Sequence, residues 1–355
     1  MDYNCHMTID EIKMIRLAGQ HLLGKTEKLA AARDLCGYQA QFFRNAWHSA
    51  RLRTQEDLSL DTWGEGLVKS WAQRGTVHVF PESDLPLFIR SCKTPEDVCE
   101  QGWYPFLVKM GIYISPERNR YFARLMVEAI REGHGTREEL KEICFSHGLT
   151  ESEAEHVFCQ WGGTIAELAG LGVLCFKVQE KKEYTLLEPF EPMPGETALL
   201  EIARRYFTHF GPATLRDFAY FMHQPQMKLR PLLECLPYKS FACDKQSYYY
   251  IENGRDDCMN LPECVFLAGF DQLMLGYEKL DSLFLPREHL RGIFNRAGIV
   301  FPALLVDGMV AGRWKEEKKS IAVTLFATLT ARRKKSVVRE AERLWKGKPV
   351  EWKEL

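Results

Sequence analysis

The chain has 355 residues, 46% of them hydrophobic and 12% aromatic, which is enough for about two to four compact units. A net charge of −1 gives no global support for nucleic-acid binding, so any DNA-binding surface has to be local. No apolar run reaches the ~18 residues that a membrane span needs, and the first residues do not have the pattern of a secretory leader.

Charged side chains are unevenly distributed along the chain. Residues 81–160 carry 14 acidic against 9 basic side chains (−5), whereas 331–355 carry 9 basic against 4 acidic (+5). The basic run Arg332–Lys335 is interpreted either as the solvated start of a terminal helix or as a phosphate contact.

The 11 cysteines include no Cys-x-x-Cys pair, so we expect no metal site and a reducing cytoplasm.

In the N-terminal third, the apolar spacing predicts helices over about 8–22, 26–36, 40–53 and 62–74, followed by an extended segment at 76–80. Two neutral amides, Gln39 and Gln41, interrupt an apolar and aromatic stretch just after Gly37. On a regular helix such positions project about 200° apart. They can serve one site only on extended backbone or at a helix start; otherwise they cap a helix or satisfy buried backbone groups.

Two later segments repeat one order of elements: a helix, a short turn, a second helix and a pair of strands. The first helices open at Gly135–Leu140 and Gly211–Phe218, and the turns are His147–Leu149 and His223–Pro225. The expected strand pairs are Val173–Val178 with Glu183–Leu187, and Ser240–Cys243 with Tyr248–Ile251. A helix-turn-helix followed by a hairpin is a winged helix, and the N-terminal third offers the same order less cleanly.

After residue 260 the pattern becomes β-rich, with strands expected at Val265–Ala268, Ile299–Val306 and Met309–Trp314. Asp307-Gly308 is typical of a type I′ hairpin turn, and helix resumes near Arg332. The predicted fold is α+β and predominantly α, built from tandem winged-helix units. The expected segments are winged-helix units over 1–115, 116–192 and 193–260, and a β-rich part over 261–355.

Four separated motifs resemble those of the AlkZ-like winged-helix DNA glycosylases. They are, in order, Gln39-Ala40-Gln41, Ser70–Val79, Gly269–Tyr277 and Phe301–Trp314. Two departures stand out. The family usually has an Asp-Arg pair shortly after the third motif, where this chain has Glu278–Asp281, and an acidic residue often follows the second glutamine, where this chain has Phe42.

The resemblance implies a monofunctional glycosylase that hydrolyses the N-glycosidic bond of N7-alkylated purines in double-stranded DNA, and some relatives unhook interstrand crosslinks. It implies Gln39 and Gln41 as the catalytic pair that positions water, without cofactor or metal. It further implies a monomer acting in the cytoplasm on nucleoid DNA, with an open channel that accepts the lesion in place.

Candidate DNA contacts are basic residues on predicted helices, hairpins and the end of the first wing. They are Arg44, Arg51, Arg53, Arg74, His78, Lys181, Lys182, Arg313 and Lys315. A stabilising role is the alternative for His78. Two other functions fit tandem winged helices: a non-catalytic DNA-binding regulator, and a protein-interaction scaffold, which the acidic stretch over 81–160 favours.

Overall fold

The computed structural model describes residues 7–100, 103–254 and 260–353, and the chain divides into two compact units. The first unit joins Met1–Leu58 to Leu199–Leu355, and the second is Ser59–Ala198. These units are coarser than the four predicted segments, and the segment 1–115 contributes to both. Within the described ranges, we find no helix that is long and apolar enough to cross a membrane.

The first unit begins with three helices and a short strand. They are α1 (Ile9–Gly19), α2 (Lys28–Asp34), β1 (Tyr38–Gln39) and α3 (Phe43–Arg53). Thr8 and Glu11 form a capping box at the start of α1. After α2 the chain turns at Cys36 and Gly37, which both have positive φ, 55° and 86°. It then runs extended through β1, so the helix predicted over 40–53 begins only at Phe43.

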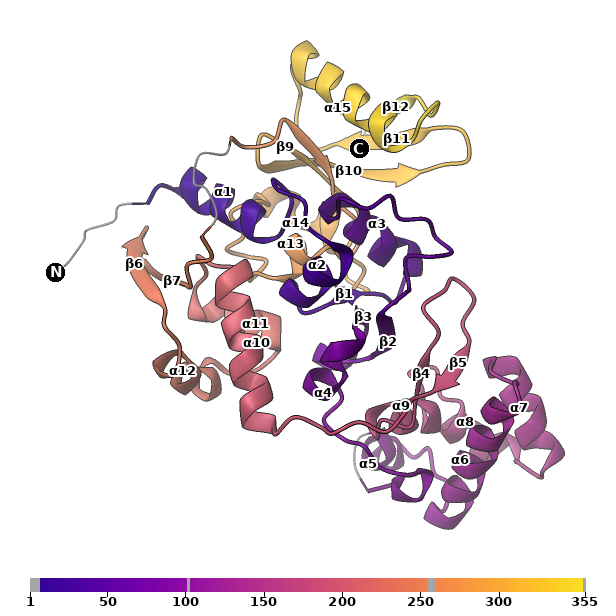
Figure 1. Cartoon of the computed structure of the whole chain (residues 1–355). Helices are drawn as coiled ribbons and strands as arrows, with labels where there is room; N and C mark the ends of the chain where they lie inside the picture. Colours follow the sequence, from indigo (N-terminus) through magenta and orange to yellow (C-terminus); the bar gives the residue numbers. More distant parts are fainter. Residues whose placement is uncertain (1–6, 101–102, 255–259, 354–355) are drawn as a thin grey trace. The chain divides into compact units, whose positions relative to one another are not determined.

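An aromatic core organises the middle of the first unit. It lies between α10 (Gly195–His209) and α11 (Leu215–Met222), where the buried Tyr206 ring packs 4.9–5.0 Å from Phe210, Phe218 and Phe221. Burial of such rings is the main stabilising contribution in this region. α12 (Gln226–Glu234) and an antiparallel pair, β6 (Lys239–Cys243) and β7 (Gln246–Tyr250), follow along the chain (Figure 1).

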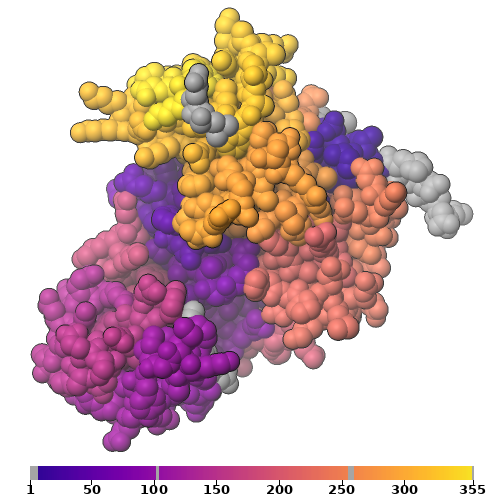
Figure 2. All heavy atoms as spheres, turned by 180° about the vertical axis from the view of Figure 1, so that it is seen from behind, coloured from indigo at the N-terminus to yellow at the C-terminus, as the bar shows by residue number. Residues whose placement is uncertain are grey.

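The C-terminal part of the first unit is a five-stranded sheet with the order β12-β11-β10-β9-β8. Its strands are β8 (Cys264–Phe266), β9 (Ala303–Val306), β10 (Met309–Glu316), β11 (Ile321–Leu325) and β12 (Val350–Lys353). Asp307 and Gly308 have φ of 50° and 72°, which agrees with the predicted type I′ turn between β9 and β10. The connecting helices are α13 (Gln272–Leu275), α14 (Leu290–Ile293) and α15 (Ala331–Leu344). Figure 2 shows this orange-to-yellow part as one continuous body.

The second unit packs helices against four strands in the order β3-β2-β4-β5. The strands are β2 (Leu67–Trp71), β3 (Val77–Pro81), β4 (Leu174–Phe176) and β5 (Tyr184–Leu186). The helices are α4 (Leu85–Phe88), α5 (Trp103–Lys109), α6 (Pro116–Arg131), α7 (Arg137–Ser146), α8 (Glu151–Val157) and α9 (Thr164–Gly170). The core is apolar and includes Phe122, Met126, Leu140 and Leu168, all fully buried.

The helix predicted over 62–74 is wrong, because this segment forms β2 and the turn after it. β2 pairs antiparallel with β3, and the hairpin reverses at Arg74 and Gly75, whose φ values are 58° and 65°. Short apolar runs such as Leu67–Trp71 fit a strand as well as a helix. The pairing with β3 makes the segment a strand. This pairing cannot be deduced from the spacing of apolar residues within the segment alone.

The helices and hairpins of the two predicted repeats are present in the predicted order, with one further helix, α9, between α8 and β4. In the second unit, α7 and α8 each begin at a capping box, on Thr136 and Thr150, and β4 and β5 follow as an antiparallel pair. In the first unit, α11 and α12 precede β6 and β7. The mixed helix and strand content agrees with the predicted α+β class, and the winged-helix assignment itself stays a prediction.

Candidate active site

The two amide side chains after α2 contact each other. Nε2 of Gln39 donates a hydrogen bond to Oε1 of Gln41 at 2.9 Å. Gln39 lies on β1 and is buried, whereas Gln41 is exposed in the loop before α3. Because successive side chains alternate along extended backbone, residues i and i+2 lie on one side of the chain. The arrangement therefore joins a buried donor to an exposed amide at the surface.

The backbone in front of the amide pair is tied to another part of the first unit. Nε2 of Gln272, on α13, donates to the carbonyl oxygen of Gly37. Tyr38 is fully buried, and burial raises the pKa of its hydroxyl well above the ordinary value. The segment entering the site is thus held by a hydrogen bond and by core packing, which fixes the direction of the next side chains.

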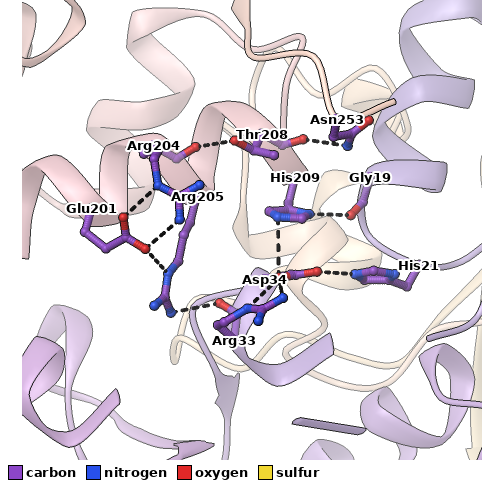
Figure 3. A network of polar contacts seen from close by, with 10 residues as sticks. All are labelled: Gly19, His21, Arg33, Asp34, Glu201, Arg204, Arg205, Thr208, His209 and Asn253. Atoms are coloured by element: carbon purple, nitrogen blue, oxygen red, sulfur yellow. Dashed lines mark hydrogen bonds and ion pairs between the residues drawn. The ribbon is translucent and has the colours of Figure 1, made fainter. Parts of the chain in front are cut away.

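A buried polar network anchors the end of α2, five residues before Gln39. Oδ2 of Asp34 lies 2.9 Å from Nε2 of His21, and Oδ1 lies 3.5 Å from Nε2 of His209 on α10 (Figure 3). Burial alone would raise the pKa of Asp34. The hydrogen bond from His21, with His209 and Arg33, outweighs it and lowers that pKa to about 2. Asp34 is therefore a carboxylate at neutral pH.

α10 holds the same turn through a second set of contacts. Glu201 accepts hydrogen bonds from Arg204 and Arg205, and Nη1 of Arg205 donates to the carbonyl oxygen of Arg33 at 3.1 Å (Figure 3). The last turn of α2 is thus fixed through its backbone as well as through Asp34.

The ligand atoms of His21, Asp34 and His209 lie within 4.8 Å of one another, which makes them the one group of described residues that could hold a metal ion. Oδ1 of Asp34, however, accepts hydrogen bonds from Nε and Nη2 of Arg33, at 3.0 and 2.9 Å. The guanidinium supplies the positive charge that a metal would bring. We therefore describe the group as a structural ion-pair network.

Arg53 does not lie at the surface, which corrects its prediction as a DNA contact. Its side chain is 0% exposed, and Nη2 and Nη1 donate to the two carboxylate oxygens of Asp271 at 2.7 and 2.9 Å. Burial acts to raise the pKa of Asp271, but the Arg53 charge and hydrogen bonds leave it lowered. This pair joins α3 to the segment before α13 and cannot reach a phosphate without unpairing a buried carboxylate.

His78 is also buried, at 1% exposure, with Nδ1 3.0 Å from the carbonyl oxygen of Thr76. Burial, with the nearby Arg74 charge, lowers the pKa of His78 to about 3, so the ring is neutral at physiological pH. A neutral, buried imidazole offers little to a phosphate. The position therefore favours the stabilising role that was the alternative for this residue.

The other predicted DNA contacts reach solvent. Arg44, in the first turn of α3, is exposed, and Arg51 on the same helix is partly buried, with its guanidinium 5.3 Å from the Trp47 ring centre. Partly or fully exposed as well are Arg74 in the β2–β3 turn, Lys181 and Lys182 between β4 and β5, and Arg313 and Lys315 on β10. Exposure allows a contact with DNA but does not establish one.

Two residues of the third motif have structural roles that the sequence pattern does not indicate. Asp271 and Gln272, which hold Arg53 and Gly37, lie inside the third motif, yet nothing in their spacing indicates those partners. In place of the usual Asp-Arg pair, Glu278 and Asp281 both lie against Arg216 of α11. The segment that departs from the family pattern is thus fixed by an ion pair within the same unit.

Comparisons with known proteins connect the chain to one family. The family model for AlkZ-like DNA glycosylases matches residues 32–346, a span that includes both glutamines. A relative from Streptomyces sahachiroi, an interstrand DNA cross-link repair glycosylase, is 25% identical over 360 residues, 92% of each chain. The solved structure of Streptomyces sahachiroi DNA glycosylase AlkZ covers 98% of this chain and 100% of its own, with a TM-score of 0.74 and 20% identity.

Proposed function

Because this chain belongs to the AlkZ-like DNA glycosylase family, we propose that it hydrolyses the N-glycosidic bond of N7-alkylated purines in double-stranded DNA. The chain is a DNA glycosylase, and its partner is DNA. The lesion class and the roles of individual residues are the proposal. The relative's name gives interstrand crosslinks as its repair target, and we extend our proposal to crosslinked N7-alkylpurines.

The chemistry of the lesion explains why neutral amides suffice. Alkylation at N7 makes the purine cationic, so the base leaves as a neutral molecule and needs no general acid. The enzyme has to stabilise an oxocarbenium-like sugar and place a water molecule near C1′. A carboxamide oxygen accepts a hydrogen bond from water and orients it without removing a proton first.

The observation that carries the proposal is the hydrogen bond from Gln39 to Oε1 of the exposed Gln41. In our mechanism the buried Gln39 fixes the Gln41 amide, whose carbonyl oxygen has two lone pairs and can accept from water as well. The partial charge on that oxygen also faces the positive charge that develops on the sugar. The pair acts without cofactor or metal.

DNA binding is assigned to the predicted winged-helix units, 1–115, 116–192 and 193–260, and to β10, in a monomer. The proposed phosphate contacts are exposed or partly exposed basic residues on α3, on β10 and in the β2–β3 and β4–β5 turns: Arg44, Arg51, Arg74, Lys181, Lys182, Arg313 and Lys315. Because bulky or crosslinked bases cannot enter a tight pocket, we expect an open channel that takes the lesion in place.

The test is release of free base from duplex DNA with one N7-methylguanine. We expect Gln39→Ala and Gln41→Ala each to lower the single-turnover rate by about 10²-fold, as loss of a preorganised polar group does. Gln224→Ala, which removes an exposed glutamine between α11 and α12, should leave the rate unchanged. Strand cleavage without heat or alkali would contradict a monofunctional enzyme, and full activity of both alanine variants would rule out the amide mechanism.

A further inference from the structure

An aromatic ring lies at the surface directly beside the amide pair. Phe42 follows Gln41 in the chain and is 50% exposed, among the more exposed aromatic side chains of the described residues. Its ring stacks on that of Phe270, with ring centres 5.5 Å apart and planes inclined by 23°. Because Phe270 covers one face, the exposed part of Phe42 is its other face and its edges.

The support beneath Phe42 is firmly held. Phe270 is 7% exposed and has a φ of 57°, and its backbone nitrogen donates to the carbonyl oxygen of Val300 at 3.2 Å. The preceding Gly269 lies so close to Asn45 of α3 that a Cβ there would be 2.6 Å from Nδ2 of Asn45. A stacked ring on such a base keeps its orientation, and little conformational entropy is lost when a ligand binds it.

The surroundings of Phe42 suit a nucleotide. Its exposed neighbours in the chain are the amide of Gln41 and the cation of Arg44. Aromatic rings flanked by polar and basic groups are the usual platform for bases next to a sugar-phosphate chain. The Cα atoms of Gln41 and Phe42 are about 3.8 Å apart, so a base stacked on Phe42 would lie next to the segment that carries the amide pair.

We propose that Phe42 is a stacking platform for the alkylated purine itself: its ring face opposite Phe270 takes the place of one neighbouring base against the lesion, which stays in the open channel. The inference rests on the proposed function. An N7-alkylated purine is cationic, so stacking on the negative face of a phenyl ring adds an electrostatic attraction that a neutral base lacks. Phe42 thus favours damaged over undamaged bases.

The attraction between Phe42 and the cationic purine affects substrate binding and the rate of base release differently. In the transition state the positive charge moves from the purine to the sugar, so the attraction to Phe42 acts mainly on the bound ground state. Loss of Phe42 should therefore weaken binding and raise the rate at saturating enzyme by up to the same factor, because the bound ground state loses more than the transition state. Loss of Gln41 should leave binding nearly unchanged and lower the rate.

Binding is measured on a duplex with one N7-methylguanine on a 2′-fluorinated sugar, which resists hydrolysis, and on the matching undamaged duplex. We expect Phe42→Ala and Phe42→Leu to raise the Kd for the damaged duplex about 10-fold and the Kd for the undamaged duplex less than about 2-fold. Phe42→Trp should stay within about 2-fold of the parent. Trp352→Ala removes another exposed aromatic ring in the first unit, Trp352 having 37% exposure and lying outside the predicted winged-helix units, and is the control.

Single-turnover release of N7-methylguanine is measured at saturating enzyme with each variant, after melting curves confirm that it is folded. Phe42→Ala should release base as fast as the parent or up to about 10-fold faster, whereas Gln41→Ala should be slower. The platform is overturned if Phe42→Leu binds damaged DNA as the parent does, or if it weakens both duplexes equally. A parent protein that releases no base, yet shows the Phe42-dependent preference, would contradict the proposed function and leave the platform standing.

Discussion

At the residue scale, the two amides differ in a way that bears on mechanism. Gln39 is buried and donates, whereas Gln41 is exposed and accepts. Neither side chain titrates, so the amide mechanism contains no group whose protonation changes near neutral pH. This distinguishes it from mechanisms that use a carboxylate or histidine as general base.

The pH dependence of base release therefore tests the assignment of Gln41. The single-turnover rate of the parent should be flat from about pH 5.5 to 8.5, because no general base titrates. Gln41→Glu places a titratable carboxylate at the same position, and its rate should fall as pH drops through about 4.3, the ordinary Glu value. A sloping profile in the parent would reveal a catalytic group outside the pair.

The buried pair of Arg53 and Asp271 gives a stability prediction. Arg53→Met leaves the Asp271 carboxylate buried and unpaired, which should lower the free energy of unfolding by about 3–5 kcal/mol. In the double variant Arg53→Met/Asp271→Leu no charge remains buried, so most of the loss should be recovered. Urea unfolding followed by tryptophan fluorescence measures both.

Arg51→Met is the matched control for Arg53, because Arg51 lies on the same helix but is only partly buried. We expect it to cost about 1 kcal/mol, because it removes one hydrogen bond, from Nη2 of Arg51 to the carbonyl oxygen of Leu344. An Arg53→Met protein as stable as the parent would mean that the ion pair does not hold α3. The sequence alone does not distinguish these two arginines, since the partner of Arg53 lies 218 residues away.

At the element scale, the network around Asp34 fixes the end of α2 and so the start of the amide segment. The folded pKa of Asp34, about 2, lies below the ordinary 3.8. A lowered carboxyl pKa contributes stability that is complete above about pH 3.8 and is lost as pH falls toward about 2. Asp34→Asn should therefore cost about 2 kcal/mol at pH 7.

This difference should shrink on acidification. The gap in unfolding free energy between the parent and Asp34→Asn should close between about pH 4 and pH 2, as followed by urea unfolding at each pH. Base release at pH 7 should fall less in Asp34→Asn than in Gln41→Ala, since Asp34 acts on the site only through α2. A gap independent of pH would mean that the Asp34 carboxylate is not what the network stabilises.

The sequence predicts a structural element well where that element depends on residues close to it in the chain. The helix predicted to begin near residue 8 and the Asp307-Gly308 turn are both present, because the cap at Thr8 and the turn are each satisfied within a few residues. The segment Leu67–Trp71 was assigned to a helix, since only its pairing with β3 makes it a strand. Extended backbone at Gln39 is one of the alternatives that the sequence leaves open, whereas the support from Gln272 and, through Asp34, from His209 comes from distant parts of the sequence.

At the scale of the whole molecule, the family match over residues 32–346 indicates a DNA-binding enzyme more clearly than the composition does. A net charge of −1 would not suggest a DNA-binding enzyme. Basic residues are nevertheless exposed at separate positions, including Arg44 in the first unit and Lys181 and Lys182 in the second. Affinity for DNA should thus depend on local contacts with phosphates, and on salt.

The salt dependence of binding counts those contacts. Each phosphate contact adds about 0.9 to the slope of log Kd against log salt concentration. Lys181→Ala/Lys182→Ala should therefore lower the slope by up to about 1.8, with equal effects on damaged and undamaged duplexes. The control is Lys93→Ala/Arg124→Ala, which removes the same charge from residues already paired with Glu100 and Glu96. If both double variants lower the slope equally, the effect comes from net charge, and the turn between β4 and β5 does not contact the DNA backbone.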